Sequence, residues 1–374
     1  MAHQNPLKIA EIVDICFEFL SGSTSDLLQY STVAHSWVDA TQSRLFRVPH
    51  ATNPQFPFSF KIQVKFLKAL NDTPRLACYV RELNIHVRGM TNSLCELPFT
   101  RLEGLSLFAE GHFPIRYILV PSVRYLNLST CYQEKSLVSF WTRCPPSIEH
   151  LEYCPRSLQL ADDLSACDTA SPVQLKSLRL DVRENVSVAF SPRILFPFDL
   201  SKLKALSLQA GMSQICESID TLSIEILEID FQHASESWNL ASFPSLTTLR
   251  INTGQGLLRI AARTLGSITP QQKIRSICIS VDTKWMQTAE FEQLDAVLAL
   301  LPLAPFPSLE FEAIELGPTW MFPASFADSK PTACSNWDMS SLRLFFPLVF
   351  ESHITMGLNS EVVLPRHVWW RVRE

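Results

Sequence analysis

One short pattern recurs along most of this chain of 374 residues and limits the folds that it can form. The pattern is an apolar residue, any two residues, a second apolar residue, any one residue and a third apolar residue. Its matches begin at Val80, Leu102, Val123, Ile148, Leu175, Leu203, Ile224, Leu246, Ile274 and Phe311. The alternation within each match is typical of a short strand with one buried face. Because so short a strand cannot bury its apolar face alone, the recurrence predicts stacked repeats.

The segments around the matches favour the same interpretation. The sequence Pro-Ser-apolar occurs at Pro121, Pro146, Pro244 and Pro307, and in the first three the apolar residue opens a match. Stretches with helical spacing fill two of the gaps, one before Cys144 and one from Trp285 to Leu301. A strand followed by a helix or loop at about 20 to 30 residues per unit resembles the leucine-rich repeat family.

The resemblance implies an α/β fold, in which short parallel strands and helices form a solenoid over residues 76–350, with a C-terminal tail at 351–374. The chain departs from the family pattern in one respect. The Asn or Cys that the family carries three places after the last Leu occurs here only as Cys131. We therefore expect irregular repeats. The alternative is a generic α/β domain that contains leucine-rich strands.

The first segment, residues 6–47, has a different pattern. Between Ile9 and Leu20 the apolar residues follow the spacing of one helical face. The pair Ser25-Asp26 can cap a second short helix, and Thr32 can open a third. A segment of about 40 residues rarely buries enough surface to fold alone, so we expect its apolar face to meet a partner. The alternative is that these helices cap a larger core.

Six stretches of this segment carry a resemblance: Glu11-Ile12, Cys16-Phe17, Phe19-Leu20, Asp26-Leu27-Leu28, Val33-Ala34-His35-Ser36-Trp37 and Leu45-Phe46-Arg47. They are similar to the F-box, the small module of three helices that docks on the Skp-type adaptor of cullin-based ubiquitin ligases. The run from Phe66 to Leu83 also resembles the passage from F-box to repeats in fungal F-box proteins. The resemblance implies an F-box-like helical module at residues 1–48 and a connector with a capping helix at 49–75. It also implies adaptor contacts at Leu7, Ile12, Phe17, Leu20, Leu28, Val33 and Trp37.

Composition restricts the partners and the compartment. The formal charge is -5, and Lys and Arg form no run, so the sequence predicts neither a nucleic-acid surface nor a membrane surface. The ten cysteines are scattered, without a Cys-x-x-Cys pair, which favours reduced thiols and a cytoplasmic or nuclear protein. The N-terminus lacks the basic start of a signal peptide.

Motifs for catalysis or cofactor binding are not evident. The sequence has no Gly-x-Ser-x-Gly elbow, no phosphate-binding Gly-Lys-Ser/Thr loop and no His-Glu-x-x-His. Gly254-Gln255-Gly256 faintly resembles a dinucleotide turn, but Arg259 occupies the place of the third glycine. Asp162, Asp163 and Asp168 fit a solvated loop better than a metal site. We therefore expect no enzyme activity, no catalytic residue, no cofactor and no metal.

In stacked repeats, the residues between the apolar positions of each strand would align in one row that points away from the core. The row would contain Asn84, Ser106, Asn127, Glu152, Arg179, Ser207, Glu228, Arg250, Cys278 and Glu315. We expect this row to be solvated, and the hypothesis is that it binds a client protein near Arg179, Glu228, Asp230 and Arg250, because charges of both signs suit a polar protein segment. The alternative is a solvated face that binds no partner.

Together these features predict a substrate-recognition adaptor of a Skp/cullin/F-box ubiquitin ligase. One alternative is a leucine-rich-repeat interaction scaffold with no connection to ubiquitination. The second is an enzyme with a site that the known motifs do not reveal.

Overall fold

The computed structural model describes residues 29, 37–38, 41–42, 45, 66, 68–88, 97, 99–110, 120–130, 144–155, 173–180, 198–209, 216, 219–231, 236–253, 257–282, 288–301, 308–314 and 355–358. Of the F-box-like module, only a few helical residues around Trp37 and Thr41 belong to this part. The predicted three helices and most of the connector therefore lie outside the described residues. The capping helix is described at its end, where residues 68–72 are helical and the short 3-10 helix η2 (Pro74–Tyr79) follows.

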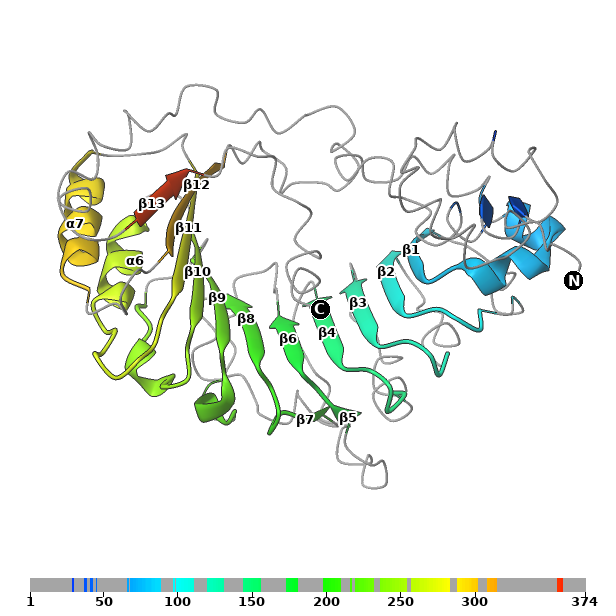
Figure 1. The fold of residues 1–374 in the computed structure, drawn as a ribbon, viewed down its shortest axis with the longest axis horizontal. Coiled ribbons are helices and arrows are strands. Elements are labelled where there is room, and N and C mark those ends of the chain that lie inside the picture. The colour runs from blue at the N-terminus through cyan, green and yellow to red at the C-terminus, as the bar shows by residue number, and fades with distance from the viewer. Residues whose placement is uncertain are drawn as a thin grey trace, which may run out of the picture.

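The strands form one sheet of eleven, all parallel and, with two exceptions, in chain order. Its members are β1 (Glu82–Arg88), β2 (Gly104–Glu110), β3 (Tyr125–Thr130), β4 (His150–Pro155), β6 (Ser177–Leu180), β8 (Ala205–Gln209), β9 (Ile226–Asp230), β10 (Thr248–Thr253), β11 (Ser276–Asp282), β12 (Ser308–Ile314) and β13 (Thr355–Leu358). The exceptions are β5 (Val173–Gln174) and β7 (Phe198–Asp199), which pair with each other in a separate sheet. The large sheet curves into an open arc (Figure 1). This topology confirms a leucine-rich-repeat-like solenoid and excludes the alternative of a generic α/β domain.

The apolar positions of the sequence pattern form the core. The first position of each match, from Val80 to Ile274, is almost fully buried, and so is the second position, from Leu83 to Ile277. Strand alternation directs these side chains to one face of the sheet, where they form a single cluster along the repeats. Burial of apolar surface therefore fixes which residues of each repeat point inward.

Backbone hydrogen bonds hold the repeats in register just before each strand begins. The carbonyl of the residue after the first apolar position accepts two N–H groups from the next repeat. Thus Arg81 O accepts from Glu103 N and Gly104 N, and the same arrangement recurs as far as Thr247 O with Arg275 N and Ser276 N. Buried backbone groups are costly when unpaired, so this ladder satisfies the strand entries without the side-chain Asn of regular repeats.

The Pro-Ser-apolar motif has a structural role in two of its occurrences. The hydroxyl of Ser122 donates to the carbonyl of Leu102 at 2.8 Å, and that of Ser147 donates to the carbonyl of Val123 at 2.8 Å. Each serine thus ties its repeat to the preceding one. Ser223, which has no preceding proline, makes the equivalent bond to Leu203 at 2.8 Å. At these three places the tie comes from a serine directly before the first apolar position of the repeat.

Two α-helices pack outside the arc, next to its C-terminal strands (Figure 1). They are α6 (Leu258–Leu265) and α7 (Thr288–Ala299). The helix α7 lies within the helical stretch predicted from Trp285 to Leu301, and the stretch predicted before Cys144 lies outside the described residues. Elsewhere in the described residues, the connections include only short 3-10 turns such as η8 (Thr221–Ser223) and η9 (Leu240–Ser242). Helices are therefore few among the connections that the structure describes.

Polar side chains in and after α6 tie together the repeats of β9, β10 and β11. Buried Gln272 donates to the carbonyls of Leu240 and Phe243, and its own carbonyl accepts from Thr269 N at 2.8 Å. Thr264 and Ser267 accept the backbone N–H groups of Trp238 and Leu240, respectively. These bonds satisfy buried backbone groups in irregular loops.

The end of the solenoid differs from the prediction in two ways. The register pairs Ile277 of β11 with Leu309 of β12, so the tenth strand begins before Phe311, where the sequence pattern had placed the start of the match. An eleventh strand, β13, lies within residues 351–374, which the sequence assigns to the tail. The pattern also has a match that begins at Phe306, and this match gives the observed register of β12. The strand β13 could not be recognised, because its four residues carry too few apolar positions.

Candidate interaction surface

The strand register aligns nine of the ten predicted row residues, one on each strand. Asn84 pairs with Ser106, Ser106 with Asn127, and the pairing continues through Glu152, Arg179, Ser207, Glu228 and Arg250 to Cys278. We call these nine residues the polar row. The prediction of Glu315 as its tenth member is wrong, because Glu310 pairs with Cys278. The row lies on the inner face of the arc, since strand alternation turns it away from the apolar core.

A network of charged and polar side chains occupies the middle of the polar row. Tyr125 Oη and Asn127 Nδ2 donate to Glu152 Oε2 at 2.7 and 2.8 Å. Arg179 Nε lies 3.3 Å from Glu152 Oε1, and Arg179 Nη2 lies 3.7 Å from Glu228 Oε1. Asn252 Nδ2 completes the network with a donated bond of 2.8 Å to Glu228 Oε1. One guanidinium therefore joins two carboxylates that come from strands on either side of it.

The small side chain of Ser207 makes this geometry possible. Strand β8 lies between β6, which carries Arg179, and β9, which carries Glu228. Ser207 occupies the row position on β8, between these two residues. A larger side chain there would fill the space that the guanidinium crosses.

The expectation that the polar row is solvated is wrong at its centre. Arg179 is 6% exposed and Glu228 is 3% exposed, and Asp230, at the next inner-face position of β9, is 8% exposed. The side chain of Glu152 is 12% exposed. Arg250 and Cys278 are half-buried. Three of the four predicted client contacts are thus buried, and Arg250 is the accessible one.

Burial also governs the protonation of Tyr125, which the sequence analysis did not single out. Desolvation raises the pKa of its phenol well above the ordinary value of 10.0, and the neighbouring carboxylate of Glu152 raises it further. The phenol therefore keeps its proton and donates it to Glu152 at any ordinary pH. Tyr125 could have been found from the sequence, because it lies two residues before Asn127 and so faces the same side of the strand.

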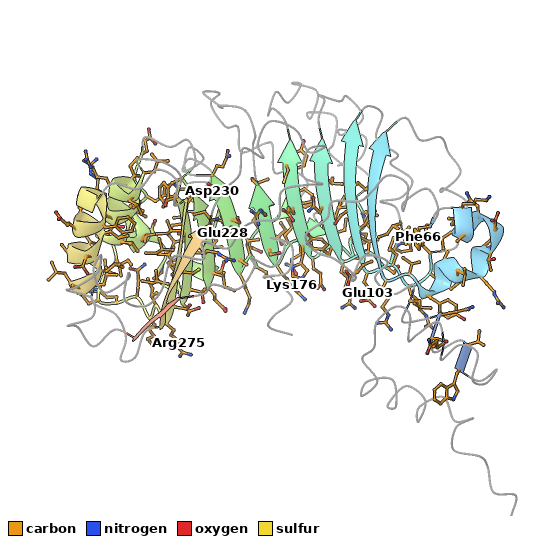
Figure 2. The ribbon with its side chains drawn as sticks, turned by 90° about the horizontal axis from the view of Figure 1, so that it is seen from above. Phe66, Glu103, Lys176, Glu228, Asp230 and Arg275 are labelled. Atoms are coloured by element: carbon orange, nitrogen blue, oxygen red, sulfur yellow. The ribbon has the colours of Figure 1, made fainter. Side chains whose placement is uncertain are left out.

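A second set of charges lies where the strands begin. Arg81 pairs with Glu103 at 3.1 Å, Lys176 with Glu149 at 2.8 Å, and Lys204 with Glu225 at 2.9 Å. Each pair joins two neighbouring repeats, and the exposed fractions of the six side chains range from 28% for Glu149 to 65% for Lys204. Figure 2 shows Glu103 and Lys176 along this edge of the sheet, with Glu228 and Asp230 further along the strands.

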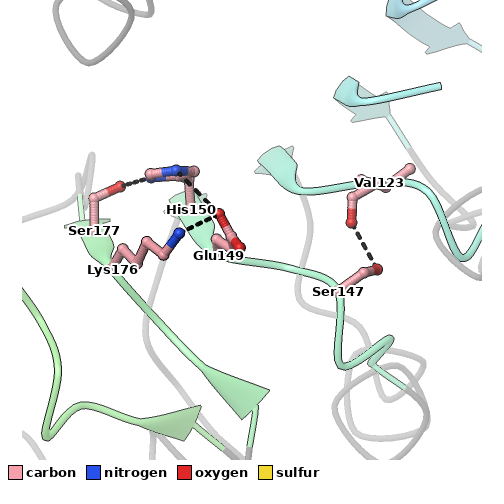
Figure 3. Close-up of polar contacts among 6 residues, drawn as sticks. All are labelled: Val123, Ser147, Glu149, His150, Lys176 and Ser177. Carbon is pink, nitrogen blue, oxygen red and sulfur yellow. Dashed lines mark hydrogen bonds and ion pairs between the residues drawn. The ribbon is translucent and has the colours of Figure 1, made fainter. Parts of the chain in front are cut away.

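His150 and Ser177 lie beside the central pair of this edge, as Figure 3 shows. His150 Nδ1 and Ser177 Oγ are 2.7 Å apart, and His150 Nε2 is 4.0 Å from Glu149 Oε2. The pKa of Glu149 lies below its ordinary value of 4.5, mainly because Lys176 donates a hydrogen bond to it. The lysine thus neutralises this carboxylate, and the contacts of His150 join the same two repeats.

Only one of the seven predicted adaptor contacts belongs to the described residues. Leu7, Ile12, Phe17, Leu20, Leu28 and Val33 lie outside the described residues. Trp37 is described, is helical and is 8% exposed. The hydroxyl of Thr41 donates to the carbonyl of Trp37 one turn earlier. In this structure Trp37 therefore packs against the chain itself.

Metal ligands, thiols and helix hydropathy are known for the part of the chain that the structure describes. No three His, Cys, Asp or Glu side chains there come together as a metal site would require. Burial raises the pKa of the Cys144 thiol to about 12. None of the described helices combines the length and the apolar character that crossing a bilayer requires.

Comparisons with known proteins assign no family to the chain. No protein-family profile matches it, and no curated protein matches it. Among solved structures, it is similar to an internalin from Listeria monocytogenes, with 12% sequence identity and a TM-score of 0.29. That match covers 67% of this chain and 82% of the internalin chain.

Proposed function

We propose that this protein is a non-enzymatic interaction scaffold that holds a client protein on the inner face of its solenoid. The observation that carries the proposal is the register of the sheet, which aligns one side chain per repeat into the continuous polar row. Solenoids use such extended concave faces for binding. A partner segment could contact many repeats at once, each through a single polar side chain.

Burial divides the charged residues of the polar row into those that stabilise the sheet and one that is accessible to a partner. Glu152, Arg179 and Glu228 hold one another in place and position the strands. Arg250 is half-buried and lies in register beside Glu228, so its guanidinium is the charged group best placed to reach a partner. A client with a carboxylate or a carbonyl at this point would gain a hydrogen bond from Arg250.

The more specific part of the proposal concerns residues 6–47. Their resemblance to the F-box supports a role as substrate adaptor of a cullin-based ubiquitin ligase in the cytoplasm or nucleus. In this proposal the apolar side chains from Leu7 to Val33 meet the Skp-type adaptor, while buried Trp37 holds the helices together. The competing function is an interaction scaffold without any ubiquitin machinery. The solenoid would bind a client in the same way in either function.

Affinity purification of the tagged full-length chain separates these functions. Recovery of a Skp-type adaptor and a cullin together with clients supports the ligase adaptor, and recovery of clients alone supports the simple scaffold. The charge reversal Arg250→Glu should remove the clients without affecting the adaptor. Arg263→Glu, on the exposed side of α6, is the matched control and should retain both. If Arg250→Glu recovers the same clients in the same amounts, the inner face is not the client surface.

A further inference from the structure

The edge where the strands begin carries a positive strip on a protein whose formal charge is negative. We call this strip the rim and define it as the charged residues directly before and after the first apolar position of each repeat. Three of its cations, Arg81, Lys176 and Lys204, form the pairs described above. Five more belong to it: Arg101, Arg124, Lys202, Lys273 and Arg275. All five are exposed, and none forms a salt bridge with a residue that the structure describes.

Most of the positive excess lies at the two ends of the rim. Between β4 and β9 the charges are more nearly balanced, because Glu149 and Glu225 pair with Lys176 and Lys204 and Lys202 is the one remaining rim cation there. Arg101 and Arg124 precede β2 and β3, where Glu103 is already paired with Arg81. Lys273 and Arg275 precede β11, and the rim positions before β10 carry no charge. Figure 2 shows Arg275 at the opposite end of this edge from Glu103.

The distance between the two basic ends follows from the sheet. The strands from β3 to β11 are consecutive in the sheet, with β4, β6, β8, β9 and β10 between them. Parallel strands lie about 4.8 Å apart, so the two ends are separated by roughly 30 Å along the rim. An extended protein segment rises about 3.3 Å per residue, so about nine residues cover this distance.

The carboxylates on the rim decide which anion fits. A nucleic-acid strand carries a charge about every 3.4 Å, so its phosphates would lie against Glu149 and Glu225 wherever it followed the whole rim. A protein segment can leave neutral residues opposite the balanced centre and place its carboxylates only at the ends. We propose that the rim binds an acidic protein segment with two clusters of Asp or Glu separated by about nine residues. The rim is distinct from the inner face, so peptide binding to the rim can be tested independently of client binding to the polar row.

The test measures fluorescence anisotropy of labelled peptides with the full-length chain at low salt. The first peptide carries two Glu-Glu clusters separated by nine Gly and Ser residues, and the second carries the same four Glu residues contiguously. The first should bind at least threefold more tightly, because only it reaches both basic ends. Equal affinity of the two peptides overturns the two-ended site, and absence of saturable binding overturns the rim altogether.

Variants locate the site. K273Q/R275Q and R101Q/R124Q should each weaken the two-cluster peptide at least fivefold, because each removes one basic end. R259Q/R263Q removes two exposed charges from α6 and should leave the affinity within twofold. Thermal melting of each variant shows that the fold is retained. If the control variant weakens binding as much as the rim variants, attraction is nonspecific and the proposal fails. Tighter binding of a single-stranded oligonucleotide of equal charge overturns the protein partner in favour of nucleic acid.

Discussion

The inner face and the rim use the same chemistry in different surroundings. On the inner face, Arg179 joins Glu152 and Glu228, and these side chains are between 4% and 12% exposed. On the rim, Lys176 and Glu149 form a closer pair, but the lysine side chain is 56% exposed. Water screens the rim pair and leaves it nearly neutral for stability, whereas burial makes each charge of the inner network dependent on the others. If distance alone decided the contribution of an ion pair to stability, the rim pair would be expected to matter more than the inner pair, which is the opposite of what burial predicts.

The largest expected effect comes from removing the shared cation of the inner face. Arg179→Met leaves Glu152 and Glu228 buried without their guanidinium, and breaking a buried pair costs about 3 to 5 kcal/mol. Urea denaturation should show a large drop in the free energy of unfolding. Lys176→Met, the matched change on the rim, should cost at most about 1 kcal/mol. Similar losses in the two variants would mean that burial does not separate the two regions.

Tyr125→Phe tests a single bond within the inner network. The change removes the phenol that donates to Glu152, and a hydrogen bond to a charged group contributes about 1.5 to 3 kcal/mol. Because the phenol pKa is raised in the folded state, its contribution is complete below the ordinary value of 10.0 and is lost as the pH rises through the folded value. The wild type should therefore approach the stability of Tyr125→Phe in strongly alkaline solution. A constant difference across that range would contradict the assigned bond.

Ser147→Ala tests the ties between repeats, which lie close to the rim. The serine hydroxyl bonds the carbonyl of Val123 (Figure 3), and its loss should cost about 1 kcal/mol in thermal or urea unfolding. Ser245 lies in the same Pro-Ser-apolar motif but is exposed and bonds no residue that the structure describes. Ser245→Ala should therefore be nearly neutral. If the two substitutions lower the free energy of unfolding equally, the motif stabilises its own turn and the hydrogen bond between repeats is not the cause.

The smallest effect should come from Lys176→Gln on the rim. Its cost, at most about 1 kcal/mol, should vanish in about 1 M salt, where exposed charges are screened. The pKa of Glu149 is lowered in the folded state, so the pair stabilises above the ordinary value of 4.5 and is lost as the pH falls through the folded value. Stability curves of the wild type and the variant should converge in acid. A difference that persists in both acid and high salt would assign Lys176 a role other than its charge.

The alternation of apolar residues in the sequence predicted the buried core more completely than it predicted the polar row. The apolar positions from Val80 to Ile279 follow the alternation of a strand, and the structure buries them as predicted. The same alternation placed nine residues of the polar row on one face. It failed at Glu315, because the last match was taken to begin at Phe311, whereas the pairing of β12 with β11 places Glu310 beside Cys278.

The sequence by itself determined which side chains of each repeat point inward, because alternation depends only on neighbouring residues in one strand. The tertiary structure alone decided how far each of the other side chains is removed from water and which charges meet. Arg179 and Glu228 are far apart in the chain and are brought together by stacking across β8. The cations of the rim are likewise dispersed in the chain and form no run. Stacking brings the cations of successive repeats close together, because adjacent strands are separated by a single strand spacing. Contacts of this kind depend on how the repeats stack, and no local pattern encodes that.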